Sequence, residues 1–253
     1  MKCNFCVIVL FFFSLVGCNQ NNFVPNENEM PVTTKSTNDG ELAWNYPMQY
    51  GTPGWADLET VEEQFNAYNI PDEILKTVST EELVKICFAY PEWGLINAYN
   101  SRRTGFFVLV DLFNGFQELF RREDAATALM NEYAKIDPFA VNQAWTDLEK
   151  GQYAFQLTKI EMILNERVMI SKLDNYGLEI LKELATSVYQ RKKMLPNIYS
   201  IWDLCPTAGI CANIVDLKNA TLFEARRAEV NYFMYYLMVG EISLLDYIVE
   251  LVK

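Results

Sequence analysis

Hydrophobic residues recur every three or four positions along most of the chain from residue 56 onward. One such stripe consists of Leu83, Ile86, Cys87 and Tyr90. The segment begins at Ser79 with Glu82 three residues later, which is a helix-capping pattern, and Pro91 closes it. This spacing places the apolar side chains on one face of an α-helix.

The same pattern predicts about ten short helices. They span residues 57–70, 79–90, 106–120, 123–136, 141–149, 153–170, 178–193, 207–218, 222–239 and 241–252. Residues 106–110 would also suit a buried β-strand, but no partner strand or hairpin signal accompanies them. We therefore expect a single all-α domain over residues 56–253, packed as a bundle or as a curved array of α-hairpins. Residues 231–239 are apolar on all sides, which predicts the central buried helix.

The first seventeen residues have the layout of a signal peptide. Lys2 is positively charged, and the apolar run that follows is shorter than the roughly 20 residues of a membrane-spanning helix. Leu15-Val16-Gly17-Cys18 resembles the lipobox of bacterial lipoproteins. The resemblance implies cleavage before Cys18 and attachment of acyl chains such as palmitate to that residue, which would hold the protein on a membrane. The alternatives are an ordinary signal peptide and a short membrane anchor.

By the same resemblance, Asn19 after the lipidated cysteine favours the outer membrane, and the side of that membrane stays open. We expect residues 18–55 to form the lipid anchor and a flexible tether, because residues 19–40 are rich in Asn, Thr, Glu and Pro. Residues 41–55 are aromatic. They either pack across the domain as an extended arm or present a ligand platform, which would consist of Trp44, Tyr46, Tyr50 and Trp55.

Composition excludes several classes of function. The formal net charge is −12, and no long basic run is present, which argues against a nucleic-acid partner. The chain contains no histidine, so Ser-His-Asp and Cys-His catalysis and histidine-held zinc are excluded. Chemistry run by carboxylates, lysine or tyrosine remains open. We expect no cofactor and no metal site.

Three cysteines remain once Cys3 and Cys6 leave with the signal and Cys18 is lipidated. Cys87 lies at an apolar helical position and is expected to be a buried free thiol. Cys205 and Cys211 bracket the sequence CPTAGIC and form either a short disulfide or two ordinary buried thiols. Two thiols without histidine are too few ligands for zinc.

Three kinds of candidate binding residue stand out, each with a structural alternative. The arginine pairs are Arg102-Arg103, Arg121-Arg122 and Arg226-Arg227, which either bind an anion or pair with acids such as Glu123 and Asp124. Aromatic stacking on a glycan would use tryptophans, which are Trp44, Trp55 and Trp93 in the first instance and also Trp145 and Trp202. Glu62-Glu63 and Glu81-Glu82 would be the acids of a hydrolase, although acids at helix starts are expected on dipole grounds.

Residues 58–133 are similar to uncharacterised helical lipoproteins of Bacteroidetes, through the stretches IPDEILKTVSTEELVKICFAYP and FNGFQELFRREDAATALMNEY. That resemblance implies an α fold and a lipoprotein address, with no activity or catalytic residues. We therefore expect a lipid-anchored envelope protein without enzymatic activity that binds a protein partner or acts as a scaffold. The alternatives are a carbohydrate-binding lipoprotein and a carboxylate-based hydrolase.

Overall fold

The computed structural model describes residues 42–252, and every regular element among them is helical. The α-helices are α1 (Val61–Asn66), α2 (Asp72–Thr77), α3 (Thr80–Ala89), α4 (Arg102–Leu112), α5 (Asn114–Arg121), α6 (Ala125–Tyr133), α7 (Asp147–Leu164), α8 (Arg167–Ile170), α9 (Asn175–Lys193), α10 (Ile201–Asn219), α11 (Arg227–Tyr236) and α12 (Ile242–Val252). The short 3₁₀ helices are η1 (Trp55–Asp57), η2 (Pro91–Ala98) and η3 (Ala220–Arg226). The predicted all-α fold is confirmed, and the described part of the chain contains no strand.

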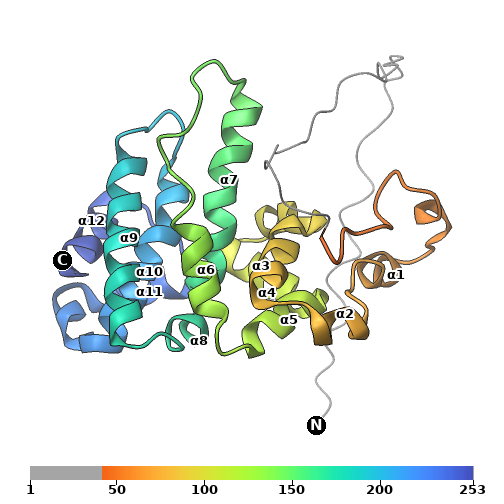
Figure 1. The fold of residues 1–253 in the computed structure, drawn as a ribbon. Helices are drawn as coiled ribbons and strands as arrows, with labels where there is room; N and C mark the ends of the chain where they lie inside the picture. Colours follow the sequence, from red (N-terminus) through yellow and green to blue (C-terminus); the bar gives the residue numbers. More distant parts are fainter. Residues whose placement is uncertain (1–41, 253) are drawn as a thin grey trace, which may run out of the picture. The chain divides into compact units, whose positions relative to one another are not determined.

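Helix α10 is the central helix of the C-terminal half. It packs against α7, α9 and α12, and the long helices α7, α9 and α10 lie side by side in Figure 1. Every residue from Leu204 to Val215 is buried, on all sides of the helix. A helix that is apolar or small around its whole circumference is buried on all sides, and α10 follows that rule.

The prediction of a central helix at residues 231–239 is wrong. Helix α11 ends at Tyr236, and Leu237 closes it in the left-handed conformation with φ of 51°. Only Val230 and Phe233 of this helix are buried, whereas Tyr232 and Tyr235 are 58% and 70% exposed. A tyrosine ring carries a polar hydroxyl and tolerates water, so an aromatic run need not be a core helix.

An aromatic cluster forms the core of the N-terminal half. Its buried members are Tyr46, Tyr68, Tyr90, Trp93, Phe106, Phe113 and Phe116. The Tyr46 hydroxyl donates to the Ile86 carbonyl at 2.7 Å, and the Trp44 indole donates to the Tyr68 carbonyl at 3.0 Å. The segment before η1 therefore packs against the helices as an extended arm through Trp44 and Tyr46.

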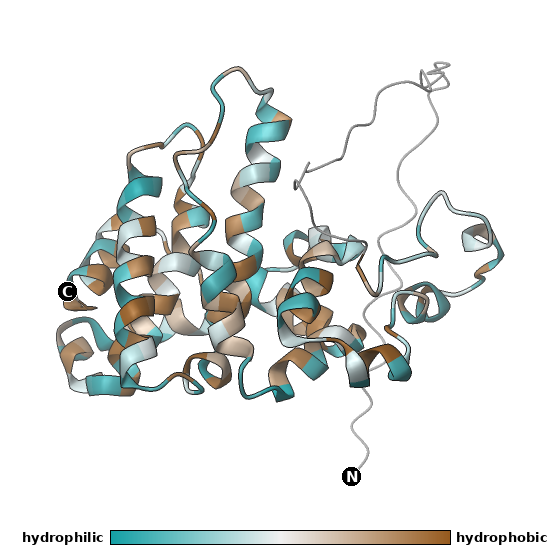
Figure 2. Cartoon of the chain, in the orientation of Figure 1, coloured by the Kyte–Doolittle hydropathy of each residue, from teal (hydrophilic) through white to brown (hydrophobic). Residues whose placement is uncertain are grey.

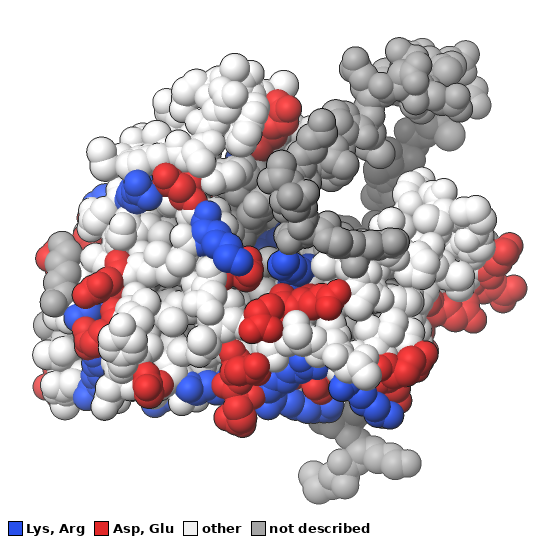
Figure 3. All heavy atoms as spheres, in the orientation of Figure 1, with Lys and Arg blue, Asp and Glu red and all other residues white. Residues whose placement is uncertain are grey.

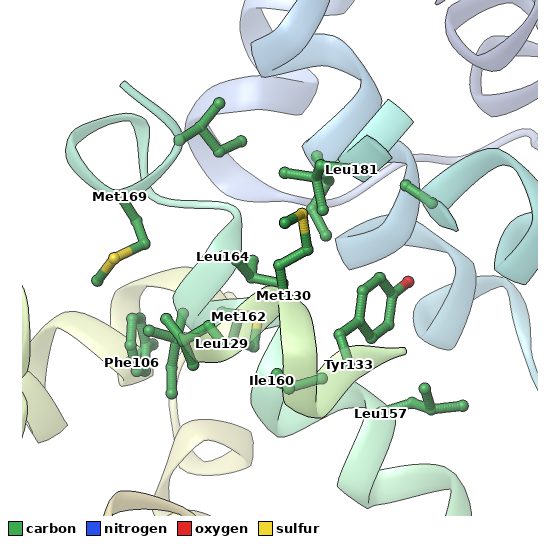
Figure 4. Packing of buried hydrophobic residues seen from close by; sticks show 14 of the residues in the cluster. Phe106, Leu129, Met130, Tyr133, Leu157, Ile160, Met162, Leu164, Met169 and Leu181 are labelled. Carbon is green, nitrogen blue, oxygen red and sulfur yellow. The ribbon is translucent and has the colours of Figure 1, made fainter. Parts of the chain in front are cut away.

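A second, aliphatic part of the core lies between α6, α7 and α9. Leu129, Met130 and Tyr133 of α6 lie beside Ile160 and Met162 of α7 in Figure 4, and all of them are buried. Figure 2 shows hydrophobic residues along these same helices, where they pack against one another. This core joins the two halves of the described chain.

Several predicted helices differ from the observed ones in their bounds, and the local contacts explain two of these differences. Residues 106–120 form two helices, because the chain turns at Phe113 and the Asn114 amide then bonds both the N–H and the carbonyl of Ile70. A Cβ at Gly115 would lie 2.4 Å from the Phe113 ring, so glycine permits this turn. Residues 141–146 are not helical; α7 begins only after Thr146, which forms a capping box with Glu149.

Candidate binding site

The most deeply buried charges form an ion pair in the core. Lys192 Nζ donates to both carboxylate oxygens of Glu161, at 2.8 and 2.6 Å, and both side chains are fully buried. Tyr133 and Thr207 donate to the same carboxylate at 2.8 Å each. Burial raises the pKa of Glu161, while Lys192 and the two hydroxyls act against that rise. None of these residues lines a pocket described below, so the cluster holds α6, α7, α9 and α10 together.

Two of the acids considered for a hydrolase, Glu63 and Glu82, accept backbone N–H groups. Glu63 accepts the backbone N–H groups of Glu59 and Thr60, which lowers its pKa. Glu82 accepts the Ala43 N–H at 2.7 Å, while its own N–H donates to Ser79. A general acid needs a raised pKa, so the shift at Glu63 runs against that role.

The structure excludes a disulfide between Cys205 and Cys211. Both residues lie on α10, both are buried, and both are free thiols, as is Cys87. Six residues along a helix separate the two Cα atoms by roughly 9 Å of rise, which is beyond the reach of a disulfide.

The tryptophans proposed for glycan stacking do not gather into one surface. Trp93 is 1% exposed and packs parallel to Phe106, so it offers no face to a ligand. Trp44 and Trp55 are partly buried against the aromatic cluster, and Tyr46 of the expected platform is buried within it. Trp145 is also partly buried, and Trp202, in the first turn of α10, is 43% exposed.

The arginine pairs are largely engaged with acids of the same chain. Arg103 pairs with Glu166 at 3.1 Å, Arg122 pairs with Glu118 at 3.2 Å, and Arg226 pairs with Glu229. Glu123 and Asp124 are not the partners that we expected. Glu123 lies 3.8 Å from Lys172, and Asp124 accepts the Thr80 hydroxyl.

One pocket does combine exposed aromatic and polar side chains, and we call it the Trp202 pocket. It has a volume of about 270 Å³. Tyr99 and Asn100 contribute from the segment between η2 and α4, Arg102 from the first position of α4, and Trp202 and Pro206 from α10. Asn97, Ile96, Ser101, Met162, Leu237 and Met238 complete its lining.

Arg102 bonds a backbone carbonyl of α10 that has no helical hydrogen-bond donor. Pro206 has no backbone N–H, so the Trp202 carbonyl four residues earlier lacks its helical donor. Arg102 donates to that carbonyl at 3.2 Å and to the Asp203 carboxylate at 3.1 Å. The other Asp203 oxygen accepts the Ser200 N–H and caps the helix. The guanidinium therefore has a fixed position.

Polar side chains lie behind the residues that line the Trp202 pocket. Gly209 allows Asn165 and Leu237 to approach α10, because a Cβ there would lie 2.3 Å from Asn165 Oδ1 and 2.5 Å from the Leu237 side chain. Asn213 donates to Asn165 Oδ1 at 3.2 Å. Arg103 reaches the carbonyl of Met234, in the last turn of α11 before Leu237.

A second depression, which we call the Tyr232 pocket, lies beside the first and shares Met238 with it. Its volume is about 480 Å³. Its apolar lining comes from Ala228, Tyr232, Met238, Val239, Gly240 and Leu244, and its charged lining from Arg226, Glu229 and Glu241. The Tyr236 ring lies tilted against Tyr232 and edge-to-face with Tyr235, with ring centroids 4.7 and 4.6 Å apart, so α11 presents an aromatic surface next to the pocket.

Sequence analysis did not find either pocket. Tyr99 and Trp202 are about 100 positions apart in the chain, and only the fold brings them together. The available signal was Pro206 inside an otherwise helical segment, because a proline there implies a carbonyl that another group must satisfy.

Four further observations bear on the expected function. Within residues 42–252, no group of three or more acids or cysteines is placed to hold a metal ion. None of the helices in that range has the length and hydropathy to cross a bilayer. Cys18, where lipidation is expected, lies outside the described residues. On the described part of the face in Figure 3, acidic and basic side chains are interspersed.

Comparison of the chain with models of protein families, with curated proteins and with solved structures gave no match.

Proposed function

We propose that this chain is a lipid-anchored protein of the cell envelope that binds a protein partner and has no enzymatic activity. The lipobox-like Cys18 supports the anchor, through which the protein would lie on the outer membrane. The Tyr232 pocket, with the exposed tyrosines of α11, supports the binding role and is the observation that carries the proposal.

The chemistry of this surface suits a protein contact. Aromatic side chains are enriched at protein interfaces, where they supply contact area at a small cost in side-chain entropy. Tyr232 and Tyr235 are exposed on α11, and Val230 and Phe233 are the residues of that helix that pack in the core. The pocket beside them takes an apolar side chain of the partner.

The charges around the pocket further define the partner. Arg226 pairs with Glu229, and Glu241 lies at the same rim, so the rim carries a net negative charge. The chain as a whole has a net charge of −12. The complementary partner presents an apolar side chain with lysine or arginine residues next to it.

Site-specific photocrosslinking in the native envelope tests the binding role. A photoreactive residue at position 232 or 235 should give one discrete crosslinked product of higher mass. The same residue at Tyr50, which is 87% exposed and outside both pockets, should not give that product. Identical patterns at all three positions, or no product at 232 and 235, would refute this binding surface.

The anchor is tested separately, with Cys18→Ala. We expect the wild type to incorporate radioactive palmitate and to fractionate with membranes, because acylated Cys18 holds it there. The variant should lose both properties. Protease treatment of intact cells then assigns the side of the membrane, since digestion indicates a surface location and protection a periplasmic one. If Cys18→Ala carries no label and still fractionates with membranes, the lipoprotein assignment is contradicted.

A further inference from the structure

The Trp202 pocket contains two large aromatic side chains that the fold leaves in contact with solvent. Tyr99 is 37% exposed and Trp202 is 43% exposed. All five tryptophans lie in the described residues, and the other four are partly or fully buried. A ligand that covers exposed apolar area in a concave site gains roughly 25 cal/mol per Å² of that area.

Polar groups beside these rings are suited to hydroxyl groups. The exposed Asn100 amide makes no side-chain hydrogen bond with the described residues, and it offers both donors and an acceptor. Asn97 Oδ1 accepts from Arg102 Nε at 3.1 Å, which orients that amide at the edge of the pocket. Hydroxyl groups both donate and accept, so they match amides better than a carboxylate or an ammonium group would.

The charge of the pocket separates neutral ligands from anions. Arg102 is the one charged residue that lines it, and Asp203 compensates this charge at 3.1 Å. The guanidinium is also committed to the Trp202 carbonyl and to Asn97. A phosphate or carboxylate would lose its hydration here without gaining an uncompensated cation as a partner. A neutral ligand avoids this cost of desolvating a charge.

We propose that the Trp202 pocket binds a neutral sugar ring of the hexopyranose class. One C–H face of the ring would cover the Trp202 or Tyr99 side chain, and its hydroxyl groups would bond the amides of Asn97 and Asn100. The volume of about 270 Å³ takes a single ring, with the remainder of a glycan outside the pocket. This site is separate from the proposed protein-binding surface and does not depend on it.

Saturation-transfer NMR on the full chain tests the proposal. The probes are glucose, galactose, mannose and N-acetylglucosamine, each at millimolar concentration, with inorganic phosphate as the anionic probe in a separate phosphorus-NMR titration. We expect at least one sugar to receive saturation and phosphate to show no binding. If none of the four sugars binds, or if phosphate binds and competes, the assignment is overturned.

Variants locate the binding. Trp202→Ala and Asn100→Ala should each weaken sugar binding about tenfold or more, because each removes one kind of contact. Trp202→Phe keeps a ring and should retain part of the affinity. Tyr176→Ala, at an exposed tyrosine outside both pockets, and Tyr232→Ala, in the other pocket, should leave the affinity unchanged.

Circular dichroism checks that each variant is folded. If Trp202→Ala unfolds, the affinities of Asn100→Ala and Tyr99→Ala for the sugar test the site instead. Full binding by those variants would overturn the site.

Discussion

At the scale of single residues, the Glu161–Lys192 pair is the most demanding contact in the protein. Lys192→Met removes the cation and leaves a fully buried carboxylate whose remaining partners are Tyr133 and Thr207. Removing one partner of a buried pair costs about 3–5 kcal/mol. We therefore expect Lys192→Met to lower the free energy of unfolding by that amount, measured by urea denaturation at neutral pH.

Two matched variants show whether charge is the cause. Lys193→Met, one position on, removes a cation that pairs with Asp246 near the surface, and it should cost less than about 1 kcal/mol. Adding Glu161→Gln to Lys192→Met removes the unpaired charge while keeping an acceptor for Tyr133, so much of the stability should return. A double variant as unstable as the single one would show that lost packing, and not charge, is responsible.

At the scale of elements, α10 depends on a side chain from another helix. Arg102 of α4 supplies the donor that Pro206 denies to the Trp202 carbonyl. This bond lies in an exposed setting, where water can partly replace it, and a hydrogen bond of this kind contributes about 0.5–1.5 kcal/mol. Arg102→Met should therefore destabilise the protein by about that much, measured by urea denaturation at neutral pH.

A double-mutant cycle isolates this contact from the bonds of Arg102 to Asp203 and Asn97. Pro206→Ala restores a backbone N–H at the position that bonds the Trp202 carbonyl. We expect Pro206→Ala to stabilise the Arg102→Met variant by about 1 kcal/mol more than it stabilises the wild type. Equal effects in both backgrounds would mean that Arg102 does not replace the missing helical donor.

The ends of helices could be predicted where neighbouring residues in the sequence, such as caps and prolines, set them. They could not be predicted where contacts with distant residues set them. Ser79 caps α3 as its pattern indicates, and Pro91 closes the segment. The break at Phe113 depends on Asn114 bonding Ile70, which is 44 residues away. The prediction of the central helix was also wrong, because a window of tyrosines and one of small apolar residues both look apolar, yet only α10 has a stretch that is buried on all sides, from Leu204 to Val215.

At the scale of the whole molecule, the sequence indicated the fold class but not the sites. Periodicity alone established an all-α body, because it needs only local spacing. The Trp202 pocket joins segments from distant parts of the chain, whereas the lining of the Tyr232 pocket lies within residues 226–244, and Met238 after α11 contributes to both. Of the aromatic candidates in the N-terminal arm, Tyr46 is buried in the core, Trp44 and Trp55 pack against it, and Tyr50 is exposed. Tyr46 bonds the Ile86 carbonyl of α3, and Trp44 bonds the Tyr68 carbonyl after α1.

The balance of buried titratable groups predicts that the protein loses stability in alkali. Burial raises the pKa of Cys205 and Cys211 to about 12, from 9.0, and raises that of Cys87 as well. Above about pH 9 the unfolded chain loses these protons while the native chain keeps them, so stability falls with pH. Lys159 opposes this, because burial lowers its pKa to about 8, and the native state releases that proton first.

The three thiols lower the free energy of unfolding as the pH rises, and the one lysine raises it, so the net change is a decrease. The decrease is at most about 1.4 kcal/mol per pH unit for each thiol that the lysine does not offset. We expect the urea midpoint, measured in the presence of a reductant, to be lower at about pH 10 than at about pH 8. Replacing Cys87, Cys205 and Cys211 with alanine removes the thiol contribution and leaves Lys159, so the fall should become smaller even though the variant is less stable overall. The same fall in the variant and the wild type would assign alkaline unfolding to the buried tyrosines, whose pKa values are also raised.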